Sequence, residues 1–191
     1  MTDSQPPPPA WYGAAARTCI RFAAATGVFG LIVGIAFQES VRKMDFTQVA
    51  PGLHIEARIH LALVHGHVFV VLVLLPLALA GALYLARRAG GAPLSRRAVR
   101  CLTRGVLPFA AATTALMLYK GYHLLLGVRW GATDLAAVDA ALYGGLRVLR
   151  YVVYGAIHGG FGLSLGLFLL ALWRSLGRAA RAADGGRPGG P

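Results

Sequence analysis

Six histidines are spread unevenly along this 191-residue chain, and most of them fall within long apolar stretches. Imidazole nitrogens bind haem iron and other transition metals, and they also carry protons. An ionisable side chain in a lipid-like setting is costly, so it is a candidate for function. We expect His54 to be solvated in a loop. The other five are His60, His65 and His67 in the second apolar stretch, His123 in the third and His158 in the fourth.

The elements that must position these histidines are four apolar segments. The chain is 57% hydrophobic and only 14% charged, with a mean hydropathy of +0.60, which excludes an ordinary soluble globule. Each segment can cross ~30 Å of hydrocarbon as a helix, and none alternates with the period of two that a membrane barrel needs. The predicted fold is therefore all-α, a bundle of four transmembrane helices over about 18–37, 57–86, 101–128 and 147–173.

The net charge of +12 predicts the topology of the bundle rather than binding to nucleic acid. Basic residues near both chain ends and in the connection between the second and third helices give one side +10, whereas the other side carries +2. Both termini are therefore expected in the cytoplasm, with the chain a multi-pass protein of the bacterial inner membrane. We expect disordered tails at 1–16, which is Pro-rich, and 177–191, which is basic, around a membrane domain at 17–176.

Two histidines are expected at the same depth. The second helix enters from the outer side near Ala57, so His67 lies ~15 Å down, and the fourth enters near Arg147, so His158 lies ~16 Å down. His65 points away from His67 on the helical wheel, so both do not easily face one site. Which of them faces the interior is left open by the sequence.

A cationic rim is expected above these two histidines. Lys120 and His123 share a face on the third helix, while Arg150 and Tyr154 accompany His158 on the fourth. A haem b with two imidazole ligands needs histidines at matching depth and cations for its propionates. The pattern therefore predicts His67 and His158 as axial ligands to haem iron, with His65 or His60 as alternatives. Lys120 and Arg150 are the expected propionate or anion partners, His123 a supporting or alternative ligand, and Tyr154 a neighbour of the cofactor.

Several segments resemble a family of uncharacterised bacterial four-helix membrane proteins. The resemblance covers about residues 20–173 and is carried by Gly30–Glu39, by His65-Gly66-His67 and by Gly155-Ala-Ile-His158-Gly159. The family has His-x-His in the second helix and Gly-x-x-His in the fourth. This chain departs from it with Lys120-Gly121 where the family has Arg-Gly. The helices also look distantly like those of the haem-copper oxidase and nitric-oxide reductase superfamily, a resemblance that implies haem binding.

Three functions follow as hypotheses. The first is an integral membrane haem b protein with a role in electron transfer, or in redox chemistry linked to a small gas or a quinone, beside another respiratory membrane protein. The second is a transporter or metal-handling protein that uses the same histidines. The third is a structural subunit or assembly factor of a respiratory complex, in which polar residues only join helices. The small residues Gly30 and Gly34 permit a homo-oligomer if their face is exposed, and the alternative is that they serve helix packing inside the bundle.

Overall fold

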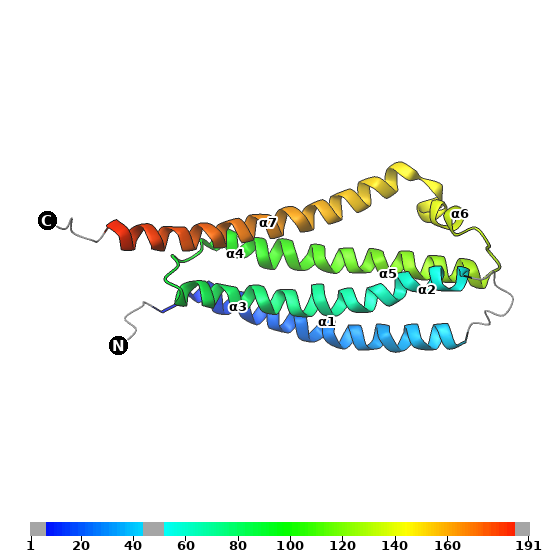
Figure 1. Ribbon diagram of the computed structural model, residues 1–191, viewed down its shortest axis with the longest axis horizontal. Coiled ribbons are helices and arrows are strands. Elements are labelled where there is room, and N and C mark those ends of the chain that lie inside the picture. Colours follow the sequence, from blue (N-terminus) through cyan, green and yellow to red (C-terminus); the bar gives the residue numbers. More distant parts are fainter. Residues whose placement is uncertain (1–6, 44–51, 186–191) are drawn as a thin grey trace.

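The computed structural model describes residues 7–43 and 52–185, except for the side chains of His54 and 178–185. The described chain is helical without any strand, and it forms an elongated bundle of four long helical spans (Figure 1). Four spans are long and apolar enough to cross a membrane: Ala10–Arg42, Ile55–Arg88, Arg96–Arg129 and Arg147–Gly177. The predicted all-α bundle of four transmembrane helices is confirmed.

The first and last spans are single helices, α1 (Ala10–Arg42) and α7 (Arg147–Gly185). The second span joins α2 (Leu53–His67), the π-helical η1 (Val68–Leu74) and α3 (Leu75–Arg88). The third joins α4 (Arg96–Cys101), the π-helical η2 (Leu102–Val106) and α5 (Leu107–Arg129). Between α5 and α7 lie the short helices α6 (Leu135–Ala140) and η3 (Leu142–Gly145). The beginning of α1 and the end of α7 lie at one end of the bundle, which we call the terminal end, and α6 lies at the other, which we call the α6 end (Figure 1).

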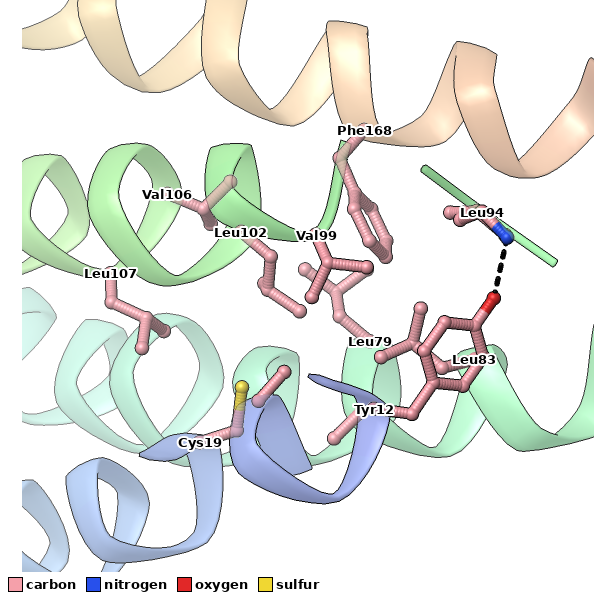
Figure 2. Packing of buried hydrophobic residues seen from close by; sticks show 12 residues of the cluster. Tyr12, Cys19, Leu79, Leu83, Leu94, Val99, Leu102, Val106, Leu107 and Phe168 are labelled. Atoms are coloured by element: carbon pink, nitrogen blue, oxygen red, sulfur yellow. Dashed lines mark hydrogen bonds between the residues drawn. The ribbon is translucent and has the colours of Figure 1, made fainter. Parts of the chain in front are cut away.

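Both predicted tails are shorter than expected, because the helices run into them. The prediction of a disordered 1–16 is wrong from Ala10 onward, since α1 begins there. Tyr12 is fully buried and its hydroxyl accepts a hydrogen bond from Leu94 N at 2.7 Å (Figure 2). Trp11 Nε1 also donates to Leu94 O at 3.3 Å. These tertiary contacts hold the first turn in place. At the other terminus α7 extends to Gly185, in keeping with the high helix propensity of its Ala and Arg residues.

The largest apolar cluster lies at the terminal end and takes residues from all four spans. Figure 2 shows Phe168 of α7 packed over Val99, with Leu79 and Leu83 of α3 below. Tyr12 and Cys19 bring α1 into the same cluster. A second cluster lies near mid-span around Val33, Val64, Val68, Leu72 and Ala110, and a third near α6 around Ala57, Leu61, Leu125 and Val128.

A proline explains how α1 is joined to the π-helical turn of the second span. Pro76 lacks an N–H, and its ring is incompatible with the carbonyl four residues earlier in a regular α-helix. That carbonyl, Leu72 O, lies 2.9 Å from Thr26 Oγ1 of α1, which shares its single hydroxyl proton between Leu72 O and Phe22 O of its own helix at 2.8 Å. In a membrane, hydroxyl side chains of neighbouring helices commonly satisfy backbone groups that proline leaves free.

Glycines bring the spans close together within one chain. A Cβ on Gly30 would lie 2.6 Å from Val68 Cγ1, and one on Gly34 would lie 2.8 Å from His65 Cε1. The face of α1 that carries these glycines is thus occupied by the second span. The homo-oligomer expected through Gly30 and Gly34 is not available on that face, because the small residues already serve packing inside the bundle.

The hydrogen bond from Thr26 to Leu72 gives a test of the helix packing. We expect Thr26→Val to lower the free energy of unfolding in detergent by ~1–2 kcal/mol, because Leu72 O loses its donor. Thr18→Val is the matched control, since Thr18 Oγ1 donates only to Ala14 O of its own exposed helix turn. Thermal unfolding followed by circular dichroism measures both. In a Pro76→Ala background, Thr26→Val should lower the free energy of unfolding by less. Equal losses of stability for Thr26→Val and Thr18→Val would contradict the role assigned to the hydrogen bond between Thr26 and Leu72.

Candidate functional site

The α6 end of the bundle holds an ion cluster that joins three elements. Asp139 of α6 lies between two cations: its Oδ1 is 3.0 Å from Lys120 Nζ of α5, and its Oδ2 is 2.6 Å from Arg150 Nη2 of α7. Arg150 Nη1 also donates to the backbone oxygen of Asp139 at 3.0 Å. α6 itself is capped by Asp134, whose Oδ1 accepts hydrogen bonds from two backbone N–H groups of the first turn. The three charged groups together carry one net positive charge.

The carboxyl of Asp139 responds to two opposing effects. Burial disfavours its charged form, but hydrogen bonds and charge attraction from Lys120 and Arg150 outweigh burial, so its pKa lies below the ordinary value for aspartate. Asp139 therefore stays ionised at neutral pH and binds α5 and α7 together through α6.

Aromatic rings form a chain beside the ion cluster. Ring centroids are 6.2 Å apart for His123 and Tyr119, 5.6 Å for Tyr119 and Tyr143, and 6.4 Å for Tyr143 and Tyr154. The chain ends on His158, whose ring stacks on Tyr154 at 5.7 Å. Aromatic pairs at such separations attract each other beyond their area burial. The contacts link α5, η3 and α7 and lead from the α6 end to His158.

Tyr143 enters this chain at the cost of backbone strain. Its φ of 57° is left-handed, which is unfavourable for a residue with a Cβ, and Gly144 and Gly145 continue the turn with positive φ. Strain of this kind persists only where surrounding contacts hold it, and it occurs often at functional sites. The Tyr143 and Tyr154 hydroxyls are buried, and neither has a hydrogen-bond partner within the described part of the chain.

The two histidines expected to bind haem share one orientation. His67 Nδ1 is 2.9 Å from Leu63 O, and His158 Nδ1 is 3.0 Å from Tyr154 O, in each case the carbonyl four residues earlier. A carbonyl only accepts, so Nδ1 carries the proton and Nε2 of the neutral ring keeps its lone pair. A metal-binding histidine is oriented in this way, with one nitrogen held by a protein acceptor and the other left for the ion.

One apolar cluster contains a residue close in sequence to each of these two histidines. Val68, which follows His67, is fully buried in the mid-span cluster. Phe161 of α7, one turn from His158, packs against the same cluster. α5 packs against both α2 and α7, and no contact between the two rings themselves is given by the structure. The histidines therefore lie on different helices, α2 and α7, each of which packs against α5.

The remaining histidines have other surroundings. His65 lies against Gly34, with its ring edge-on to Phe69 at 5.1 Å. His60 lines a cavity with Glu56, Lys120 and Asp139 at the α6 end. The expected supporting histidine, His123, places Nε2 3.0 Å from Val138 O of α6. The side chain of His54, which was expected to be solvated, is outside the described part of the structure.

The sequence-predicted residues therefore fall into two groups. Lys120 and Arg150 meet at one ion cluster, and Arg150 lies one turn from Tyr154, which stacks on His158. His67 stands apart on the second span. Sequence reasoning missed the shared partner Asp139 and the inserted ring of Tyr143. An available signal for Asp139 was its position in a short connection between two helices that each carry a cation near their α6 end.

Among the described side chains of residues 7–43 and 52–177, which leave out His54, no three His, Cys, Asp or Glu gather as a candidate metal site. No family model, no curated protein and no solved structure matches this chain.

The ion cluster predicts a dependence of stability on pH. Because the pKa of Asp139 is lower in the folded state than in the unfolded state, its contribution is complete above the unfolded value of ~3.9 and is lost as the pH falls through the folded value. We expect Asp139→Asn to lose ~1–3 kcal/mol at pH 7, and the difference from wild type to shrink below about pH 4. Unfolding in detergent between pH 7 and pH 3 measures both.

The matched control for this experiment is Asp134→Asn. Asparagine caps a helix about as well as aspartate, so this variant should change stability by only a few tenths of a kcal/mol. A loss in Asp139→Asn that is the same at pH 7 and pH 3 would show that the charge of the carboxylate is not responsible.

Proposed function

We propose that this chain is an integral protein of the bacterial inner membrane that binds one haem b and transfers electrons, with both termini in the cytoplasm. The observation that carries the proposal is the shared orientation of His67 and His158. Each ring donates Nδ1–H to its own helix, so each offers Nε2 as a ligand. Two imidazoles on different membrane helices are a common donor set for a haem that carries electrons.

The surroundings of the two histidines fit this group. Val68, next to His67 in the chain, and Phe161, one turn from His158, belong to one apolar cluster, and an apolar setting suits the porphyrin face. Glycines at 155, 159 and 162 flank His158 on an exposed face of α7, and a Cβ at any of them would meet nothing within 4 Å, so no side chain of another helix covers that face. Lys120 and Arg150 lie toward the α6 end of His158 with a net positive charge after Asp139 is counted, which suits the carboxylates of haem.

Haem supplies one-electron chemistry when bound, and the protein supplies binding and electrostatics. His67 and His158 hold the iron and, through their Nδ1–H bonds, keep their Nε2 lone pairs oriented. Lys120 and Arg150 attract the carboxylates, and Asp139 limits the net charge of that rim. The chain of aromatic rings joins His158 to the α6 end of the bundle. In this proposal the redox partner meets the protein there or in the membrane.

The experiment is a reduced-minus-oxidised absorption spectrum of the full chain, purified in detergent from a haem-replete host. A haem b band is expected. His67→Ala and His158→Ala should each abolish the band, because a bis-imidazole site loses one ligand. Added imidazole should restore it in part, since the small ring can fill the space left by the truncated side chain. His54→Ala is the matched control, as a histidine expected outside the apolar stretches.

Two results would contradict the proposal. Absence of a haem band in the wild-type protein rejects haem binding, and metal analysis of the same sample then tests for Cu or Zn held by the histidines. A band that survives in both His67→Ala and His158→Ala rejects the assigned ligands. Size-exclusion profiles that match the wild type ensure that a lost band is not a lost fold.

A further inference from the structure

A cavity of about 450 Å³ lies between α1 and α2, away from the ion cluster. Leu31 and Ile35 on its rim expose 58% and 67% of their surface, so the cavity opens on the side of the bundle that faces lipid. Its walls are apolar except for two groups, the Gln38 amide and the His65 imidazole. The lining residues that matter are Leu31, Ile35, Phe37, Gln38, Ala62 and His65.

The His65 ring is held in the wall of this cavity by contacts on two sides. Gly34 makes room for the ring, since a Cβ there would lie 2.8 Å from Cε1 and 2.9 Å from Nδ1. Phe69 contacts the ring edge-on at 5.1 Å from the other side. Nδ1 is buried and has no hydrogen-bond partner in the described structure. A buried N–H without an acceptor is costly, so the neutral ring carries its proton on Nε2 and has a donor to offer.

Gln38 places a second donor one helical turn away. It follows Gly34 by four residues on α1, which is ~6 Å along the helix axis. The cavity thus offers the Gln38 amide from α1 and the His65 imidazole from α2, an aromatic wall at Phe37 and an opening to lipid. This arrangement suits a flat, apolar ring with a carbonyl oxygen at each end.

We propose that this cavity binds the headgroup of a lipid-soluble quinone, with Gln38 and His65 as donors to its two carbonyl oxygens. Ligand sites are commonly apolar with a few placed polar groups, and the opening to lipid admits the isoprenoid tail. An acyl chain would fill the apolar walls but would leave both donors unpaired. A quinone bound here is the redox partner in the proposed electron transfer, so its role rests on that function. Quinone binding itself is measurable without haem.

The test uses the full chain in detergent and decylubiquinone as the probe, with bound quinone measured by equilibrium dialysis. We expect saturable binding in the wild type. Gln38→Leu and His65→Leu should each weaken binding about tenfold, the effect of one lost hydrogen bond to a buried carbonyl. Gln38 is exposed at the rim, so its variant should fold even if His65→Leu does not. Ser40→Ala is the control, because Ser40 Oγ bonds only to Ala36 O of its own helix.

Each outcome decides the inference. Weaker binding in Gln38→Leu with unchanged binding in Ser40→Ala supports the site. Unchanged affinity in Gln38→Leu, or displacement of the quinone by dodecanol at similar concentration, overturns it and shows a groove for acyl chains. Haem content is recorded for every sample: quinone binding without haem leaves this site standing and rejects the haem proposal, and haem without quinone binding does the reverse.

Discussion

Water is absent from the hydrocarbon layer, so each polar group inside the four spans must find its partner within the protein or in a ligand. That constraint accounts for much of the architecture. Leu72 O, left free by Pro76, is satisfied across the helix interface by Thr26. His67 and His158 turn Nδ1 back onto their own helices. In each case the partner sets the orientation of a side chain or the approach of two helices.

The same constraint draws attention to the buried polar atoms that lack a hydrogen-bond partner. In the described structure these include His65 Nδ1 and the hydroxyls of Tyr143 and Tyr154, all of them buried. A buried polar atom without a hydrogen bond costs ~1–3 kcal/mol, so natural proteins keep few of them. His65 Nδ1 lies at the lipid-facing cavity and the two hydroxyls lie along the aromatic chain to His158, whereas Thr113 Oγ1, a further buried atom of this kind, belongs to neither place.

The sequence predicted the four spans because membrane helices depend on composition, which is local and additive along the chain. It mispredicted the beginning of α1 because the first turn of that helix depends on Trp11 and Tyr12 contacting Leu94, a residue more than 80 positions away. The position of Lys120 and Arg150 on the α6 side of His158 was likewise accessible from helix direction and rise. Their shared partner Asp139 was not, because it lies in a connection whose path composition does not determine.

Helical periodicity also has a limit inside the spans themselves. A wheel of 100° per residue holds for α2, so the opposition of His65 and His67 is a fair inference from spacing, and His65 indeed contacts α1. The π-helical turn begins directly after His67, and a π-helix has a different number of residues per turn. Every residue beyond Val68 is thereby rotated relative to the predicted face. The residue positions of His67, before the π-helical turn, and of His158, on the continuous α7, therefore keep the spacing of a regular α-helix, although the ring of His158 is exposed on α7.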